Sequence, residues 1–296
     1  MSLELRPLHP LFVAEASGID LRRPLNAAEV GEIERAMNEH AVLVFRGQPL
    51  SQADQVRFAE SFGPLDIGLR KLYGGGKGGP HRLDFDTLLD ISNVEVDGSL
   101  SRRDSRKNMS NLANQLWHSD SSFQRPKAQY SMLSAVVVPS WGGETEFADL
   151  RAAYDALPGD LRCDITGLEA EHYALHSRIM LGDAGYSEAQ MAAIPPVCWP
   201  LAQVHPGSRR RLLFVGVHAR RIIDYPLAEG RVLLSDLLEH ATQRQFVYRH
   251  EWQVGDLVMW DNRCTVHRGR RYDLAERREL RRTTTDDLLP VQMAAA

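Results

Sequence analysis

The chain has 296 residues, of which 43% are hydrophobic and 25% are charged. These proportions are usual for folded globular proteins and exclude a wholly disordered or fibrous chain. Its formal net charge of -4 provides no overall positive field for a phosphate backbone, so we expect no nucleic acid among its partners.

The first part of the chain predicts two helices around a buried strand. Apolar residues at helical spacing predict a helix over 27–40, and the apolar run 41–45 predicts a buried strand directly after it. Ser51 is suited to cap a second helix, which the Gly63-Pro64 pair ends.

The segment 67–111 differs in character, because it contains clustered glycines and a charged stretch over 102–107. Only 88–94 within it has the composition of a strand. Irregular segments of this length are typical of active-site lids or of disordered loops, and both interpretations apply here.

Strands dominate the remainder of the chain. The predicted strands occupy residues 130–138, 211–217, 245–252, 257–261 and 279–285. A helix over 228–241 interrupts them, and the region 160–195 is predicted to be a helical insertion. Helices first and many short strands afterwards favour a mainly β fold with flanking helices. We expect one domain over 1–296, built as an antiparallel sandwich or barrel and not as a parallel α/β sheet.

Several functional classes lack their sequence signals. The segment 74–79 satisfies G-x-G-x-x-G, but Pro80 follows where a dinucleotide site requires a helix, so we interpret this segment as a loop. Three cysteines without a C-x-x-C pair indicate neither a disulfide framework nor a thiolate zinc site. The chain shows no signal peptide and no run of roughly 18 apolar residues. We therefore expect a cytoplasmic protein without membrane contact, and the sequence is compatible with a homo-oligomer.

One set of residues has the spacing of a metal site. His118-Ser119-Asp120 places an imidazole and a carboxylate two residues apart, which on a strand turns both to one face. Chance alone supplies roughly 1.4 such triplets in a chain of this composition, so the triplet is weak evidence by itself. His267 follows the strong strand 257–261 and offers a third ligand. Two histidines and one carboxylate leave positions open on the metal, as in non-haem Fe(II) enzymes that use O2.

Two arginines follow this histidine at the last predicted strand. Arg278 and Arg282 share one face and lie about 13 Å apart at roughly 3.3 Å per residue. On an inward face, each guanidinium could clamp a different carboxylate, because its fork matches carboxylate geometry. On an outward face, the same residues would form a solvated basic patch.

These motifs together resemble one enzyme family. The stretches 114–123, 142–147 and 260–267, together with Arg278, are similar to the taurine dioxygenase superfamily of Fe(II)- and 2-oxoglutarate-dependent oxygenases. Within it, they are most similar to the members that cleave phenoxyalkanoates, and the similarity extends over nearly the whole chain. The resemblance implies a double-stranded β-helix, or jelly-roll, fold, which agrees with the strand-rich pattern.

The resemblance also implies roles for individual residues. The Fe(II) ligands would be His118, Asp120 and His267. The residues that hold the distal carboxylate of 2-oxoglutarate would be Thr145 and Arg278. The contacts to a small anionic aromatic substrate would be Arg282, Asn114, Lys71 and His218. For His218, an ordinary buried histidine is the alternative interpretation.

For a phenoxyacetate, the implied reaction is hydroxylation of the carbon next to the ether oxygen, while O2 converts 2-oxoglutarate into succinate and CO2. The resulting hemiacetal would collapse to a phenol and glyoxylate, so ether cleavage needs no hydrolytic groups. Two alternatives stay open. One is a dioxygenase of the same superfamily that acts on a sulfonate, a sulfate ester or another aromatic carboxylate. The other is a non-catalytic jelly-roll protein that binds a structural metal.

Overall fold

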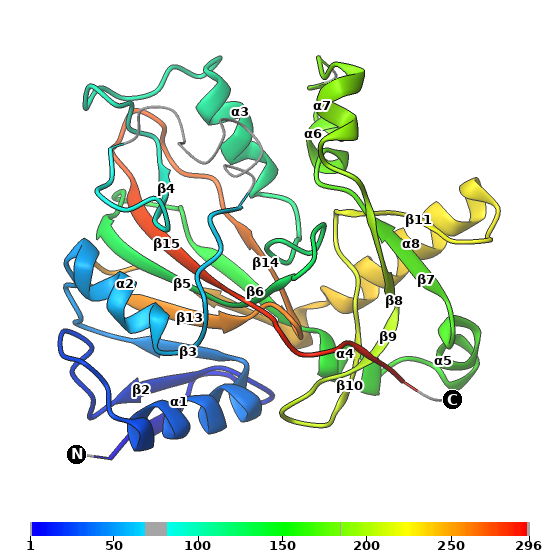
Figure 1. The fold of residues 1–296 in the computed structure, drawn as a ribbon, viewed down its shortest axis with the longest axis horizontal. Helices are drawn as coiled ribbons and strands as arrows, with labels where there is room; N and C mark the ends of the chain where they lie inside the picture. Colours follow the sequence, from blue (N-terminus) through cyan, green and yellow to red (C-terminus); the bar gives the residue numbers. More distant parts are fainter. Residues whose placement is uncertain (1, 69–81, 184, 295–296) are drawn as a thin grey trace.

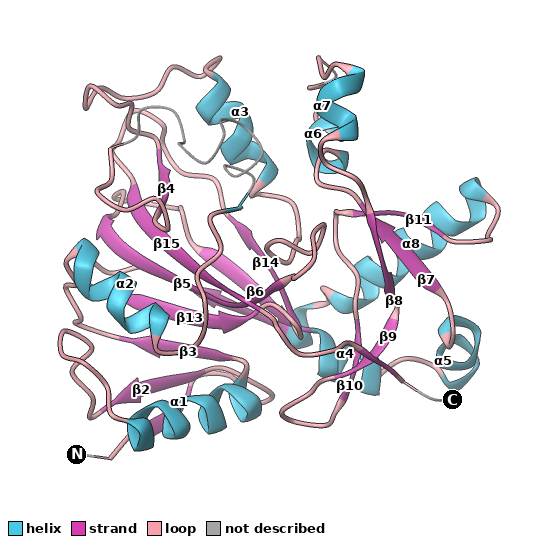
Figure 2. Cartoon of the chain, in the orientation of Figure 1, coloured by secondary structure: helices cyan, strands magenta, loops and turns pink. Residues whose placement is uncertain are grey.

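The computed structural model describes residues 2–68, 82–183 and 185–294, so Lys71 and the glycines at 74–79 lie outside the described residues. The described residues form four β-sheets with helices packed around them (Figures 1 and 2). The helices are α1 (Ala27–His40), α2 (Gln52–Glu60), α3 (Arg106–Ala113), α4 (Leu150–Asp155), α5 (Gly159–Ile165), α6 (His176–Met180), α7 (Glu188–Ala192) and α8 (Leu227–Ala241).

A seven-stranded sheet is the largest element of the fold. In the order in which they pair, its strands are β1 (Glu4–Pro7), β2 (Ala14–Ser17), β3 (Val42–Phe45), β13 (Leu257–Asp261), β5 (Ala128–Val137), β15 (Glu279–Asp286) and β4 (Leu89–Ser92). Neighbouring strands are antiparallel except for β2 and β3, which run parallel.

Three smaller sheets of three strands each complete the β structure. They are β12 (Val247–His250), β6 (Thr145–Asp149) and β14 (Thr265–Gly269); β11 (Ala219–Ile222), β7 (Glu169–His172) and β8 (Val197–Pro200); and β10 (Arg211–Leu213), β9 (Ala202–Val204) and β16 (Gln292–Met293). A short 3-10 helix over Arg244–Phe246 leads into β12.

Helices α1 and α2 cover one face of the large sheet (Figure 1). Asn26 and Ser51 cap their N-terminal ends, each in a reciprocal capping box with the third helical residue. Apolar side chains of both helices pack in one buried cluster with Leu257 and Met259 of β13. Because side chains alternate along a strand, Val258 and Trp260 point to the opposite face.

That opposite face of the large sheet meets the sheet of β12, β6 and β14. Val258 and Trp260 share a buried cluster with Phe147 of β6, and the rings of Phe147 and Trp260 lie 5.4 Å apart. His267 of β14 lies beside the same tryptophan at a ring distance of 4.7 Å. The two sheets therefore face each other across a shared core, and the candidate metal ligand His267 lies in the layer between them.

Most of the predicted elements are confirmed. Helices α1, α2 and α8 and strand β13 match their predicted ranges to within two residues. Ala41 was expected to begin a strand, but it adopts a left-handed conformation (φ 59°) that ends α1, and β3 starts after it. The strand predicted over 211–217 ends already at Leu213.

The region 160–195 is a correction, because it is not purely helical. It contains α6, α7 and most of α5, but β7 lies among them and pairs with both β8 and β11. The four residues of β7, Glu-Ala-Glu-His, have little strand preference of their own, so pairing with two neighbours decides their conformation. Helix α3 was likewise not predicted within 67–111, although Ser105 caps it by accepting the Asn108 N–H. The lid assignment for 67–111 stays a prediction.

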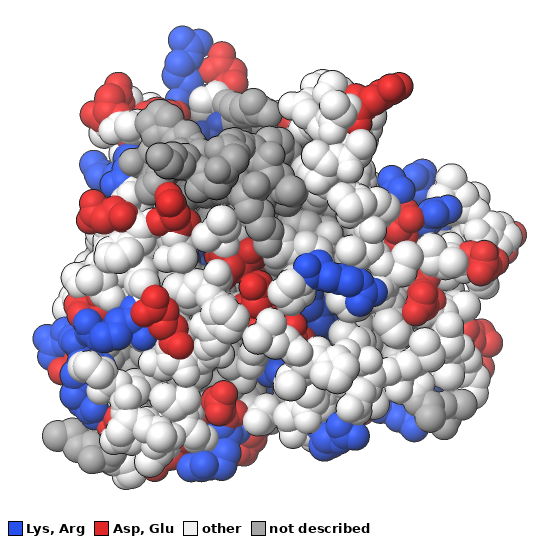
Figure 3. Space-filling view, in the orientation of Figure 1, with Lys and Arg blue, Asp and Glu red and all other residues white. Residues whose placement is uncertain are grey.

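Charges of both signs are interspersed on the face of the molecule that Figure 3 shows, in agreement with the small net charge. Across residues 2–68, 82–183 and 185–294, no helix combines the length and the apolar character that a membrane crossing needs.

The loop that carries Gly142 leaves no room for a side chain at this position. Gly142 has a φ of +73°, and a Cβ atom there would lie 2.2 Å from the Arg271 carbonyl oxygen. We therefore expect Gly142→Ala to lower the free energy of unfolding by about 1–3 kcal/mol, measured by urea denaturation. Gly159→Ala is the matched control, since its Cβ would meet nothing within 4 Å. Equal stability of the two variants would show that the loop adapts to a side chain.

Candidate active site

His118, Asp120 and His267 come together although half of the chain separates the two histidines. Their possible ligand atoms all lie within 4.8 Å of one another, and all three residues are buried. The Nε2 atoms of His118 and His267 lie 3.8 Å from different carboxylate oxygens of Asp120. The structure therefore assembles the three residues that the sequence analysis combined into one site.

Backbone pairing brings the two histidines together. His118 and His267 form an antiparallel bridge in which each N–H donates to the other carbonyl, at 3.0 and 2.8 Å. Asp120 does not lie on a strand beside His118, as the spacing had suggested, but in the turn that follows. The Ser119 hydroxyl anchors this turn by donating to the Thr265 carbonyl (2.7 Å), and Ser121 continues it with a positive φ of 49°. A turn, and not the alternation of a strand, thus positions the carboxylate.

Hydrogen bonds orient two of the three ligands, His118 and Asp120. His118 Nδ1 lies 2.7 Å from the Leu116 carbonyl, so this nitrogen carries the proton and Nε2 keeps a lone pair directed at the cluster. The Ser131 hydroxyl donates to Asp120 Oδ2 (2.7 Å). Asn262 supports both Ser131 and Asp120, since its amide N–H donates to Ser131 Oγ (2.9 Å) and its side-chain carbonyl accepts the Asp120 N–H (3.1 Å).

Ser131 and Asn262 were not among the residues predicted from the sequence. Both are buried polar residues: Ser131 lies within the predicted strand 130–138, and Asn262 directly follows the predicted strand 257–261. Their contrast with these apolar surroundings is the signal that could have identified them. Nothing in their spacing relates them to Asp120.

Burial and charge set the protonation of the cluster. Burial lowers the pKa of both histidines, and that of His267 falls well below its usual range. Burial alone would raise the pKa of Asp120, but Arg282 and the histidines outweigh it and lower this pKa to about 2. Near neutral pH, the cluster therefore combines one carboxylate with two neutral imidazoles.

This donor set fits a divalent metal ion. Two metal bonds of about 2.0–2.2 Å span at most about 4.4 Å, and both histidine nitrogens lie 3.8 Å from an Asp120 oxygen. Neutral imidazoles and an ionised carboxylate are the forms that bind metals. Three protein ligands leave positions open for small molecules, which suits Fe(II) chemistry with O2 better than a closed structural site.

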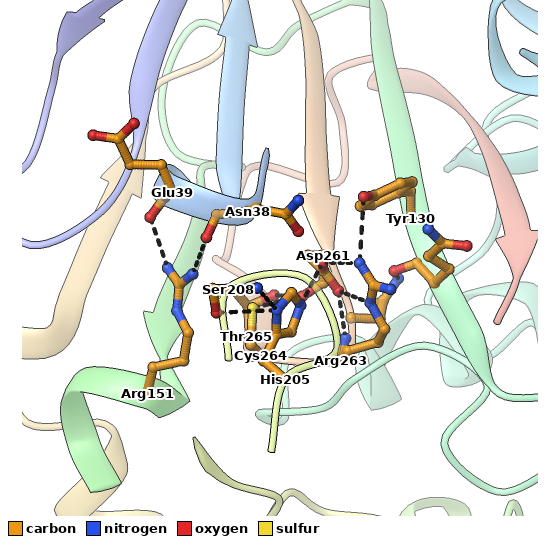
Figure 4. A network of polar contacts seen from close by, with 12 residues as sticks. Asn38, Glu39, Tyr130, Arg151, His205, Ser208, Asp261, Arg263, Cys264 and Thr265 are labelled. Atoms are coloured by element: carbon orange, nitrogen blue, oxygen red, sulfur yellow. Dashed lines mark hydrogen bonds and ion pairs between the residues drawn. The ribbon is translucent and has the colours of Figure 1, made fainter. Parts of the chain in front are cut away.

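A second group of potential ligands, His205, Asp261 and Cys264, does not fit a metal (Figure 4). His205 Nδ1 accepts the Ser208 N–H (2.9 Å), and its Nε2 donates to Asp261 Oδ2 (3.0 Å). Arg263 donates to both Asp261 oxygens, at 2.9 and 2.6 Å. Burial also raises the pKa of the Cys264 thiol. These groups are already hydrogen-bonded or protonated, so they are not available to a metal. Their hydrogen bonds instead hold together the turn between β13 and β14.

A cavity of about 310 Å³ lies against the first cluster. His118 and His267 contribute to its wall. Apolar and aromatic residues make up another part of the wall: Ile91, Leu112, Leu133, Trp260, Tyr272 and Leu274. The predicted residues that also line it are Asn114, Thr145, Arg278 and Arg282.

Arg278 is a buried cation in the wall of this cavity. Its guanidinium donates to the Gly143 carbonyl (3.0 Å) and lies 5.3 Å from the centre of the Tyr272 ring. Within the described part of the chain, it forms an ion pair with no carboxylate. Burial lowers its pKa to about 10, which still leaves it positively charged at neutral pH. A buried guanidinium without a counter-ion is well suited to bind an anion that enters the cavity.

Arg282 contacts the metal cluster directly. It projects from β15 into the same cavity and donates to Asp120 Oδ1. The inward interpretation of the two arginines is therefore confirmed, although β15 begins only at Glu279 and has a register shift between Glu279 and Leu280. Arg281 points to the opposite face, where it donates to the Leu50 carbonyl (2.9 Å).

The remaining candidates differ in position. Asn114 ends α3 and lines the cavity. His218 does not appear in the cavity wall; its ring packs edge to face on His118 at 6.2 Å and on Phe123 at 4.8 Å. This position favours a packing role for His218 over contact with substrate.

Comparisons with known proteins agree with this geometry. Residues 4–284 match the family described as Taurine catabolism dioxygenase TauD, TfdA family. An alpha-ketoglutarate-dependent 2,4-dichlorophenoxyacetate dioxygenase of Cupriavidus pinatubonensis is 62% identical over 287 residues, which cover 97% of this chain and 99% of the relative. A protein of the same name from a Burkholderia species is 58% identical over 285 residues, covering 96% and 95%. The crystal structure of AAD-2 in complex with Mn(II) and N-oxalylglycine matches with a TM-score of 0.90 at 42% identity, over 100% of both chains.

The lowered histidine pKa values predict how metal binding depends on pH. Two imidazoles with the usual pKa of about 6.5 would lose roughly a hundredfold in metal affinity at pH 5.5, because both must lose a proton to bind. Here burial lowers both pKa values, and Asp120, with a pKa of about 2, stays ionised. We expect the Mn(II) affinity, measured by calorimetry, to fall less than about tenfold between pH 7.5 and pH 5.5. Circular dichroism at both pH values checks that the protein stays folded, and a loss near a hundredfold would contradict the prediction.

Proposed function

Because the chain belongs to the TauD/TfdA family and is an Fe(II)- and 2-oxoglutarate-dependent dioxygenase, we propose that its organic substrate is a phenoxyacetate-type acid such as 2,4-dichlorophenoxyacetate. The two relatives compared above carry this substrate in their names. One observation supports the proposal most directly: a single cavity is lined by five arginines, among them Arg278 and Arg282, by both histidines of the metal cluster and by apolar side chains. An aromatic ring with a carboxylate matches that combination.

Two anion sites would serve two different acids. Arg278 is buried and has no carboxylate partner among the described residues, so it would bind the distal carboxylate of 2-oxoglutarate. The Thr145 hydroxyl lines the same part of the wall and would donate to that carboxylate. Arg282 would bind the carboxylate of the phenoxy acid, and Asn114 would add a polar contact to it.

The remaining residues would orient the aromatic ring and exclude water. Leu112, Leu133 and Leu274 offer an apolar surface for the ring, while the metal cluster lies beside Arg282. Holding the acid by its carboxylate next to the metal would place its methylene carbon nearest to the reacting centre. Bound Fe(II), with 2-oxoglutarate and O2, would supply the oxidising power for hydroxylation of that carbon.

The products follow from where the oxygen atoms go. One atom of O2 enters succinate as 2-oxoglutarate loses CO2, and the other becomes the new hydroxyl group on the carbon beside the ether oxygen. The resulting hemiacetal breaks its bond to the phenol oxygen and passes the hydroxyl proton to it. Phenol and glyoxylate are then released without a hydrolytic residue.

We also propose that the strand arrangement is a double-stranded β-helix. The large sheet and the sheet of β12, β6 and β14 pack face to face around Phe147 and Trp260, with the metal cluster between them. This arrangement, with antiparallel pairing in almost every strand, supports the jelly-roll class that the resemblance implied.

The decisive assay measures O2 consumption by iron-loaded protein with 2-oxoglutarate, with and without 2,4-dichlorophenoxyacetate. We expect one phenol and one succinate for each O2 consumed. His118→Ala is the control and should lose metal binding and turnover while keeping the fold, because its imidazole is a ligand. Succinate that does not respond to the phenoxy acid would contradict the substrate assignment. A panel of sulfonates, sulfate esters and other aromatic carboxylates would then identify the anion.

The two arginines should separate the two acids. We expect Arg278→Ala to weaken 2-oxoglutarate binding and Arg282→Ala to raise the KM of the phenoxy acid. Each change should correspond to a loss of roughly 2–5 kcal/mol in binding free energy. Arg281→Ala is the matched control, because it removes a neighbouring guanidinium that points to the opposite face. Since Arg282 also contacts Asp120, the metal affinity of each variant is measured separately. Equal effects of both substitutions on both acids would overturn the assignment.

A further inference from the structure

Trp252 lies directly behind Thr145. Its indole N–H donates to Thr145 Oγ1 at 3.0 Å. An indole nitrogen can only donate a hydrogen bond, whereas a threonine hydroxyl can donate one and accept two. Thr145 Oγ1 is therefore the acceptor, and its own hydrogen must point away from Trp252.

The hydrogen of the Thr145 hydroxyl can point into the cavity. Thr145 is buried and lines the cavity together with Arg278. Across the described residues, no group accepts a hydrogen bond from the Thr145 hydroxyl. A buried donor without an acceptor is costly unless a ligand accepts its hydrogen. The hydroxyl is thus prepared to donate to an anion held by Arg278.

Trp252 is held in place from its other side. It is half-buried, is not among the residues of the cavity wall, and packs edge to face on the His250 ring at 4.5 Å. His250 Nε2 in turn lies 3.1 Å from Asp256 Oδ2. His250 is also the residue of β12 that pairs with Thr145 of β6. The indole is therefore fixed relative to the strand that carries the threonine.

We propose that Trp252 is a positioning residue for 2-oxoglutarate: its indole N–H keeps Thr145 Oγ1 as an acceptor, so that the hydroxyl hydrogen is directed to the distal carboxylate beside Arg278. This inference rests on the proposed function of Thr145 and Arg278, and adds a residue that touches neither substrate. Loss of the indole N–H leaves the hydroxyl free to rotate, which weakens one hydrogen bond and leaves the ion pair with Arg278 intact.

The test compares Trp252→Phe in three backgrounds: the natural chain, Thr145→Ser and Thr145→Val. The dissociation constant of 2-oxoglutarate is measured by calorimetry on Mn(II)-loaded protein without O2, and KM and kcat are measured on the iron-loaded enzyme. We expect Trp252→Phe to weaken 2-oxoglutarate binding about two- to tenfold in the first two backgrounds and not at all in the third, which lacks the hydroxyl. Within each background, Trp252→Phe should leave the KM of the phenoxy acid unchanged. Any general loss of packing caused by Trp252→Phe cancels when its effects are compared between backgrounds, because the same tryptophan change is made in each.

Trp141→Phe is the matched control, since this tryptophan is 59% exposed, and it should leave 2-oxoglutarate binding unchanged. An equal loss from Trp252→Phe in the Thr145→Val background, or no loss in the natural chain, would overturn the role of Trp252. If Thr145→Val weakens binding but Trp252→Phe does not, only this inference fails. If Thr145→Val itself has no effect, the proposed 2-oxoglutarate site fails with it.

Discussion

The active site depends on balancing charges that are removed from water. Asp120 is buried and ionised. Its negative charge is balanced by Arg282 and by the metal cation that it would bind together with the two neutral imidazoles. Arg278 is a buried cation that only a ligand can balance within the described part of the chain. Since an unbalanced buried charge is expensive, this pattern favours the binding of one metal cation and of acids.

A second buried network keeps the ligands in register. Asp261 ends β13 and is bonded by His205 and by Arg263, whose guanidinium also donates to Tyr130 of β5 (Figure 4). The turn that follows leads directly into β14 and His267. All the polar atoms of Asp261 and His205 are satisfied, so this network stabilises the turn without competing for the metal. Both clusters contain histidine and aspartate, but the hydrogen bonds of the second cluster and the protonated Cys264 thiol distinguish it from the metal site.

The sequence predicted that His118, Asp120 and His267 come together near both arginines, because their combined spacing, weak in each part, resembles that of one enzyme family. It could not predict that a turn places Asp120, since the same spacing fits a strand and only the pairing with β14 reveals where the strand ends. It missed β7 because the partners β8 and β11, and not local preference, determine that strand. It missed Asn262 and Trp252 because such residues act through a partner that is distant in the chain. Their roles become visible only when the hydrogen bonds are known.

The separation of the ligands along the chain links metal uptake to folding. His118 and Asp120 leave the ribosome long before His267, so the growing chain holds an incomplete donor set until most of the large sheet has been synthesised. The site then forms only when the two distant segments pair, and closing so long a loop is an entropic cost of folding. Bound metal in turn favours the paired state by mass action. By this linkage, bound metal would add stability to the pairing of the two distant segments, while the protein without metal keeps its fold.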